Sequence, residues 1–496
     1  MKISSKAWWY KDLTKVASPV FGEFVENHQA PKEATDGQYR TLPAVLKGQV
    51  QVGPTAFTEY WTALDIERSC RDCRHAWRDR FWTPLRTLWA FLLQVLHEGS
   101  SCREAVALAL GGQAAAGFLP PRSADPSAYC QARRRLPLAV LRAGVRQVGQ
   151  RLRDEVGSAI TWCGRRVWLV DGTSCSMPDT PDLQAAFGQP GGQAPGCGFP
   201  VAKVVALFCW ASGAVLEVAI GPLRMSELRL WRDLWGVLSP GEIVLGDRFY
   251  CTFYDLVGVM RRGCDALFRL HQARPADLRQ GRRLGRNDRL VTWRRPMWNA
   301  RPRGMKRRQW KALPETLTVR LIRFAVDIPG FRSQVITVAT TLLDPVAYPA
   351  EKIAVLYRDR WLIELRFRDL KTTMGMEVLR GKTADVVRKE ICMHLLVYNL
   401  IRCLMWQAAA RHGRPLHRLS FAGTVDRLKA LAPYLWLYEG TPRAQELYNL
   451  LLRWMAQDLV PDRPNRVEPR AVKRRPKEYD RLNRPRDEMR KALVRK

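Results

Sequence analysis

The chain has 496 residues, enough for a large buried core and about three domains. Its 81 Lys and Arg against 47 Asp and Glu give a formal net charge of +34. A field this positive attracts polyanions, which favours a nucleic acid as partner over an anionic membrane or a ribonucleoprotein scaffold. The start of the chain has no apolar signal region and the twelve cysteines are scattered, which argues against a secreted, disulfide-linked protein and indicates the reducing cytosol.

The N-terminal part of the chain predicts helices. Residues 1–60 have a polar middle, and we expect a loose arm there. From 61 to 155 the apolar residues recur at helical spacing, for example in WTPLRTLWAFLLQVLHEG, and Ser100 or Ser101 is placed to cap the next helix. Because the later helices are rich in arginine, we expect a helical DNA-binding domain over 61–155. The alternative is a helical bundle whose arginines lie on a solvated face.

Near residue 160 the pattern changes to strands. The apolar segment RRVWLVDGT predicts a strand that ends at Asp171, and GEIVLGDRFY predicts one that ends at Asp247. Between them, VVALFCWASGAVLEVAIG is long enough to suggest a membrane span, but its central Ala-Ser-Gly predicts a turn and therefore a hairpin of two strands. We expect residues 160–271 to form the first part of a mixed α/β core.

The segment 272–345 is both basic and rich in strand-forming residues. Between residues 272 and 316 there are 14 Lys and Arg against three acidic residues, interleaved with Trp293, Trp298 and Trp310. Two strands, TLTVRLIRFAV and SQVITVATTLLD, follow. This composition predicts a β-rich basic insertion between two parts of the core.

Helices return after residue 345. The core resumes over 346–412 with a long helix, KIAVLYRDRWLIELRFRDLKTTMG, and a second, largely buried one that contains Arg388, His394 and Arg402 and is therefore a poor membrane span. Further helices are expected over 413–460. The final segment, 461–496, is basic and broken by prolines, which predicts a mobile arm.

The first of these helices carries the sharpest pattern in the chain, Y-x2-R-x3-E-x6-K, formed by Tyr357, Arg360, Glu364 and Lys371. Spacings of three, four and seven place a carboxylate, two cations and a phenol on one helical face. A surface glutamate in ion pairs is the plainer alternative. With Asp171 and Asp247, however, Glu364 completes three carboxylates from separate parts of the chain. Such a set can hold the divalent ions that phosphodiester chemistry uses.

These three signatures resemble those of the DDE transposases of bacterial insertion sequences, in the class defined by the YREK signature (insertion sequence family four). The resemblance covers roughly residues 90–480. It implies an RNase H-like mixed-sheet core with an inserted β-rich subdomain, flanked by an N-terminal helical DNA-binding region and C-terminal helices. It also implies that Asp171, Asp247 and Glu364 are the catalytic residues and bind two Mg²⁺ ions, which Mn²⁺ can replace.

The resemblance further implies how DNA is bound. Tyr357, Arg360 and Lys371 would contact phosphates of the transposon end, with Arg248 as a further contact. Cut-and-paste transposases of this class pass through a DNA hairpin, in which a tryptophan of the insertion stacks on a flipped base. Trp298 is the first candidate for this tryptophan and Trp293 the second. The alternative is that both rings simply pack inside the insertion. The implied partners are double-stranded DNA, at the terminal inverted repeats and the target, and a second copy of the chain in a synaptic complex at the cytoplasmic nucleoid.

Three other interpretations remain open from the sequence. The chain could be a DNA-binding relative without catalysis, although all three carboxylates are present. It could be an RNase H-like nuclease that cuts without joining. Cys70, Cys73 and nearby His75 could hold zinc, but no second ligand pair follows at the spacing of a structural site.

Overall fold

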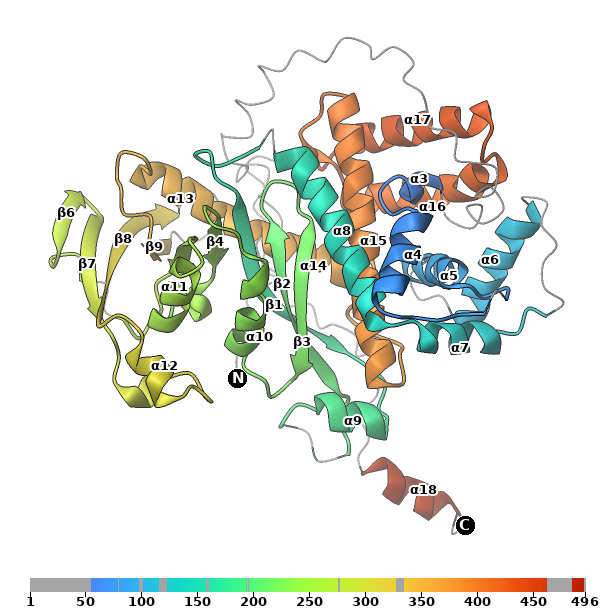
Figure 1. The fold of residues 1–496 in the computed structure, drawn as a ribbon, viewed down its shortest axis with the longest axis horizontal. Coiled ribbons are helices and arrows are strands. Elements are labelled where there is room, and N and C mark those ends of the chain that lie inside the picture. Colours follow the sequence, from blue (N-terminus) through green and yellow to red (C-terminus); the bar gives the residue numbers. More distant parts are fainter. Residues whose placement is uncertain are drawn as a thin grey trace.

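The computed structural model describes residues 55–78, 80–97, 101–115, 123–157, 160–192, 194, 196–274, 277–326, 334–461 and 484–494. Most of the arm expected over 1–60, and most of the tail expected over 461–496, lie outside these ranges. The described residues build one long sheet with helices on both faces and at one end (Figure 1).

The sheet has nine strands in the order β3-β2-β1-β4-β5-β9-β8-β7-β6. Along the chain they are β1 (Val167–Ser176), β2 (Val201–Cys209), β3 (Val215–Pro222), β4 (Ile243–Gly246), β5 (Asp265–Arg269), β6 (Arg282–Gly285), β7 (Asp288–Arg294), β8 (Thr316–Val326) and β9 (Gln334–Thr340). β1 is antiparallel to β2 and parallel to β4, which is parallel to β5. The predicted mixed α/β core is confirmed.

The apolar segment that resembled a membrane span is the predicted hairpin. β2 and β3 pair antiparallel, and the chain reverses through Gly213, whose φ of 79° favours glycine. Three side chains of later helices bind the turn: Arg402 donates to the carbonyl of Ser212, Tyr398 donates to that of Gly213, and Asn399 bonds both the N–H and the carbonyl of Val215. The hairpin is therefore fixed from outside as well as by its own ladder.

The strand that carries Asp171 is longer than the sequence predicted. We expected it to end at Asp171, but β1 continues to Ser176, and Asp171 pairs with Ala206 of β2 in its middle. The reason is that β2 continues the antiparallel ladder past the Gly-Thr pair, which is not a turn. The parallel ladder to β4 does end early, at Leu169 opposite Leu245. Asp247 directly follows β4, as predicted.

The β-rich segment extends the same sheet and forms no separate one. β9 pairs antiparallel with β5, and β8, β7 and β6 follow outward to the free end in Figure 1. A buried ion pair joins this extension to the connection that returns to the core. Arg320 of β8, fully buried, donates to both carboxylate oxygens of Asp288 and to the carbonyls of Leu342, Asp344 and Tyr348.

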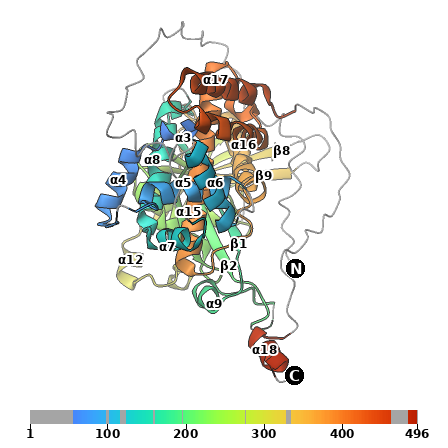
Figure 2. The ribbon, with the colours of Figure 1, turned by 90° about the vertical axis from the view of Figure 1, so that its right-hand side faces the viewer.

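Within the described residues before the sheet, the helices are α3 (Thr55–Thr58), α4 (Ala63–Asp72), α5 (Pro84–Leu96), α6 (Cys102–Ala115), α7 (Ser127–Arg135) and α8 (Leu138–Gly157). The hydroxyl of Ser101 accepts from the N–H of Glu104, so the predicted cap of α6 is confirmed for Ser101. α8 packs against β3 and against α15 (Ala384–Arg411), and α5 also packs against α15 (Figure 2). The predicted helical region therefore shares a core with the sheet.

Helix α15 is long and apolar enough to cross a membrane, yet 83% of its apolar window is buried inside the protein. It is the central core helix, as its internal charged residues indicated. α16 (Phe421–Leu437) and α17 (Pro442–Gln457) pack on each other beyond it. Within the expected basic tail, residues Arg486–Val494 form helix α18, because RDEMRKALV lacks the prolines that interrupt the preceding segment.

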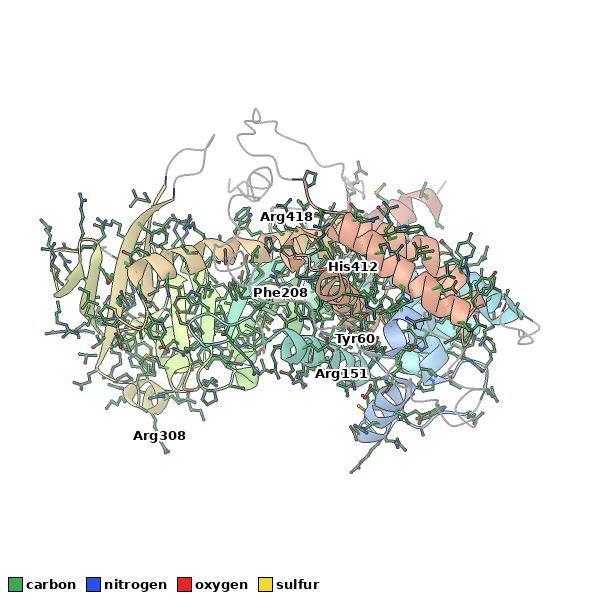
Figure 3. The ribbon with its side chains drawn as sticks, turned by 90° about the horizontal axis from the view of Figure 1, so that it is seen from above. Tyr60, Arg151, Phe208, Arg308, His412 and Arg418 are labelled. Carbon is green, nitrogen blue, oxygen red and sulfur yellow. The ribbon has the colours of Figure 1, made fainter. Side chains whose placement is uncertain are left out.

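The remaining helices flank the sheet. α9 (Pro181–Phe187) follows β1, α10 (Glu227–Asp233) packs on β2 and β3, and α11 (Phe253–Met260) packs on β5. α12 (Arg307–Lys311) lies at the far end, where Figure 3 shows Arg308 pointing away from the body. α13 (Ala350–Arg358) and α14 (Leu362–Arg368) run along the sheet on the face away from α10 and α11 (Figure 3).

Candidate active site

Asp171 and Asp247 occupy equivalent positions on neighbouring parallel strands. Leu169 of β1 is opposite Leu245 of β4. Asp171 lies two residues further along β1, and Asp247 lies two residues after Leu245, directly past the end of β4. Because side chains alternate between the faces of a sheet, a separation of two keeps both aspartates on the face of this leucine pair. Asp171 is 6% exposed and its Oδ1 accepts from the N–H of Gly172 (2.8 Å), whereas Oδ1 of Asp247 accepts from Phe249 (2.7 Å).

Glu364 comes to this site on α14, which packs against β1. Its Oε1 is 3.3 Å from Nη2 of Arg360, one helical turn earlier, and both side chains are less than one-fifth exposed. Arg360 and Glu364 therefore form an ion pair on one face of the helix. The pair borders the core, since Phe367 of the same helix packs edge-on against Phe208 of β2.

The helix that carries Glu364 is not uniform, although the sequence predicted one long helix. It passes from α13 through a 3₁₀ turn (Asp359–Trp361) into α14 and ends in a π-helical turn (Asp369–Thr373). Buried polar contacts hold the irregular part: Arg366 donates to the carbonyls of Cys209 and Trp210, and Trp210 Nε1 donates to Asp359. These tertiary bonds set the direction of α14 in a way that helical periodicity cannot reveal.

Arg360 is the group that all three carboxylates share. Burial alone would lower the pKa of the Arg360 guanidinium. The neighbouring phenol of Tyr357 and three carboxylates have the opposite effect and outweigh burial, so that the pKa is raised. These carboxylates are Asp171, Glu364 and Asp247. All three carboxylates therefore contribute to the electrostatic environment of one guanidinium. The register of β1 with β4 and the packing of α14 on β1 bring the three predicted residues into the same part of the fold.

Tyr357 lies beside Arg360, whereas Lys371 lies beyond the end of α14. Tyr357 is 4% exposed, its hydroxyl reaches toward the carbonyl of Gly246 at 3.5 Å, and burial raises its pKa to about 12. Lys371 lies in the π-helical turn and pairs with Glu377 at 3.3 Å. The π turn shifts Lys371 off the α-helical stripe.

Two further arginines lie beside Asp247. Arg248 is exposed and donates to Gln272 (2.9 Å). Arg269 ends β5, the next parallel strand, and burial lowers its pKa, as do its neighbours Arg248 and Arg360. Sequence reasoning missed Arg269, although a basic residue at the end of the apolar run DALFR was a usable signal: the carboxyl ends of parallel strands meet at one edge of a sheet.

The predicted stacking residues lie in the β-rich extension. Trp298 begins a 3₁₀ turn (Trp298–Ala300) and packs edge-on against the buried Trp310, and the guanidinium of Arg301 lies 4.1 Å above its ring. The guanidinium of Arg274 likewise lies 4.1 Å above the ring of Trp293 of β7. Both rings are half-buried and already in contact with a cation, so each is partly packed and partly accessible.

The three carboxylates suit a hard divalent cation in chemistry, since Mg²⁺ and Mn²⁺ prefer carboxylate oxygens. Among the residues that the structure describes, no three Asp, Glu, His or Cys side chains are close enough to hold a metal ion as they stand. The charge of Arg360 interacts with all three carboxylates. The chemistry of the donor set therefore fits a divalent ion, but the spacing of the three carboxylates in this structure does not yet form a coordination site.

Comparison with known proteins agrees with the geometry. The family described as "Transposase DDE domain" matches residues 162–400, which span the sheet and α15. The transposase InsG for insertion sequence element IS4 of Escherichia coli K12 is 28% identical over 71% of this chain and 78% of its own length. The putative transposase InsZ of the same organism is 27% identical over 28% of this chain and 47% of its own length. This chain belongs to the DDE transposases of bacterial insertion sequences, in the group of the IS4 transposase.

Proposed function

We propose that this chain binds the terminal inverted repeats of its own insertion sequence, cuts the DNA there and joins the freed ends to a target. The observation that carries the proposal is that the parallel register of β1 and β4 brings Asp171 and Asp247 close together, while α14, which carries Glu364, packs against β1. A triad of carboxylates in a chain with a net charge of +34 combines the chemistry of phosphodiester transfer with attraction to DNA.

The catalytic core is proposed to be RNase H-like. The strand order β3-β2-β1-β4-β5, with β1, β4 and β5 parallel, supports this assignment. In this proposal β6 to β9 are the inserted β-rich part, and the helices over 61–155 bind the transposon end. The exposed Arg134 and Arg135 at the end of α7 support a phosphate-contacting role for that region.

Asp171, Asp247 and Glu364 would hold two Mg²⁺ ions, with Mn²⁺ as a substitute, and the bound ions would activate the attacking oxygen and stabilise the leaving one. The chain's own residues supply the positioning. Hydrogen-bonded strands hold Asp171 and Asp247 in register, while Arg366 and Asp359 fix the helix that carries Glu364. Arg360, with a positive charge at any physiological pH, is placed to bind the phosphate that the triad acts upon.

Other cations and aromatic rings would position the DNA strands. Arg248, which follows Asp247, and Lys371, in the π-helical turn after α14, would contact DNA phosphates. The buried hydroxyl of Tyr357 would orient the segment that leads into Asp247. Trp298 would stack on a base that is flipped out during hairpin formation. The base would then replace part of the present contact between the Trp298 ring and the guanidinium of Arg301. Pairing of the two transposon ends would require a homodimer in a synaptic complex, working at the nucleoid in the cytoplasm.

The test is incubation of the purified chain with labelled DNA that carries the element's own ends, in Mg²⁺ and in EDTA. The proposal predicts cleavage at the end in Mg²⁺ only, followed by products joined to target DNA. Tight end binding without cleavage in Mg²⁺ or Mn²⁺ would instead identify a DNA-binding relative without catalysis. Cleavage without joined products would identify a nuclease.

A further inference from the structure

A fourth carboxylate, that of Glu227, lies directly behind the pair of aspartates. Glu227 begins α10, and its carboxyl carbon is only 2.5 Å from the point where a Cβ on Gly172 would stand. Gly172 follows Asp171 in β1 and therefore faces the opposite side of the sheet. The carboxylate of Glu227 thus rests on the backbone of the residue next to Asp171, a contact that only a glycine permits.

Tyr250 connects this carboxylate to the second aspartate. Tyr250 is fully buried and ends the 3₁₀ turn Arg248–Tyr250, whose N-cap is Asp247. Its hydroxyl donates to Oε1 of Glu227 at 2.5 Å, and its ring lies 2.9 Å from the position of a Cβ on Gly246. The segment that begins at Asp247 is therefore tied to α10 through one hydrogen bond.

Packing keeps the connecting groups in place. The ring of Tyr250 packs edge-on against Trp231 of α10, one helical turn after Glu227. The side chain of Val170 of β1 lies 3.0 Å from the position that a Cβ on Gly246 would occupy. Val170 and Gly172 lie on the face of the sheet that turns away from Asp171. A compact group on this rear face thus spans both strands that carry the aspartates.

We infer that Glu227 is a positioning residue for catalysis: by accepting the hydrogen bond of Tyr250 while resting on Gly172, it sets the spacing between Asp171 and Asp247. The inference rests on the proposed function, because the spacing matters only if both aspartates bind the metal ions. Partners that orient metal ligands from behind typically contribute tenfold to hundredfold in metal affinity or activity. Glu227 acts here through the backbone and Tyr250, not by touching metal or DNA.

Three variants remove the connection in different ways. Glu227→Ala removes the acceptor, Tyr250→Phe removes the donor, and Gly172→Ala displaces the carboxylate by adding a Cβ at 2.5 Å from its carbon. Glu227→Gln keeps the size and an acceptor oxygen but removes the charge. Matched controls are Gly236→Ala, where a Cβ would meet nothing within 4 Å, and Tyr254→Phe, on the neighbouring helix α11.

The experiment is a Mn²⁺ titration of the full chain bound to its DNA ends, followed by calorimetry, together with the cleavage rate at saturating DNA and the thermal unfolding midpoint. We expect the three disrupting variants to raise the Mn²⁺ concentration at half-saturation about tenfold to hundredfold, while the affinity for DNA stays unchanged. Glu227→Gln should stay within about threefold of the wild type, as should both controls, because the hydrogen bond to Tyr250 persists.

The outcomes separate the inference from the function on which it rests. Wild-type Mn²⁺ binding by Glu227→Ala and Tyr250→Phe would overturn the positioning role alone. Equal losses in Glu227→Gln and Glu227→Ala would also overturn it, since charge and not the hydrogen bond would then matter. If Glu227→Ala fails to fold, Tyr250→Phe and Gly172→Ala give the same decision. Absence of Mn²⁺ binding and of cleavage in the wild type would overturn the proposed function and this inference with it.

Discussion

Arg360 explains how three carboxylates can gather in a folded chain. Like charges repel, and their mutual approach costs free energy unless a cation offsets it. The guanidinium of Arg360 interacts with Asp171, Asp247 and Glu364, and it is anchored on the same helix as the last of them. At the residue scale, Arg360 therefore offsets part of the repulsion among the three carboxylates.

Trp298 gives a test of the DNA pathway at this scale. Trp298→Ala should slow hairpin formation or resolution by about tenfold, because base–aromatic stacking contributes roughly 1–3 kcal/mol. First-strand cleavage should keep its wild-type rate. The products are resolved over time on denaturing gels, with Trp293→Ala as the matched control on β7. An unchanged product pattern in Trp298→Ala, with a changed one in Trp293→Ala, would move the stacking role to Trp293.

Asp359 gives a test of how the helix of Glu364 is held. Burial raises its pKa from 3.8 to about 7, although the hydrogen bond from Trp210 opposes the shift. Between about pH 4 and pH 7 the unfolded chain has lost this proton while the folded chain keeps it. The stability of the fold therefore falls as the pH rises through this window and levels off above it.

Asp359→Asn removes that dependence, because an amide does not ionise and its oxygen still accepts from Trp210. From pH 4 to pH 7 the wild type should lose on the order of 2–4 kcal/mol more stability than the variant, at about 1.4 kcal/mol for each unit of pKa difference. Denaturant unfolding at several pH values measures both curves. Parallel curves would show that Asp359 ionises normally in the folded chain.

At the scale of elements, the local signals in the sequence were sufficient for most strands and helices. The hairpin of β2 and β3 followed from Ala211-Ser212-Gly213, and β4 followed from the apolar run before Asp247. The length of β1 was wrong, because its continuation depends on pairing with β2, which lies some thirty residues away. The 3₁₀ and π turns around Glu364 were missed for the same reason: Arg366 and Asp359 impose them through contacts with the hairpin.

The attachment of the β-rich extension to the core also depends on contacts between residues that are distant in sequence. Arg320→Met should destabilise the chain by about 3–5 kcal/mol, because it leaves the carboxylate of Asp288 buried without its cation. Arg323→Met, on the same strand, is the control and should cost less than about 1 kcal/mol. Denaturant unfolding compares the two variants. A loss in Arg320→Met no larger than in the control would show that the buried pair does not hold the extension.

For the whole molecule, one continuous sheet explains why the three carboxylates can be so far apart in sequence. Asp171 lies on β1 and Asp247 directly follows the adjacent parallel strand β4. The chain then builds five more strands, β5 to β9, before returning with α13 and α14 along the opposite face. The sequence predicted these site residues from their motifs and from the family resemblance. It could not predict the common sheet or the contact of Glu227 with Gly172, since each arises only when distant segments pack.

The central claim is that Glu364 acts with the two aspartates in metal-dependent cleavage. The most direct measurement compares Glu364→Gln with Glu351→Gln, an exposed glutamate of α13, for binding and cleavage of labelled transposon ends in Mg²⁺. The account predicts that Glu364→Gln binds the ends with unchanged affinity but cleaves them more than about a hundredfold more slowly, while Glu351→Gln behaves as the wild type. Cleavage by Glu364→Gln at the wild-type rate would contradict the assignment of the triad.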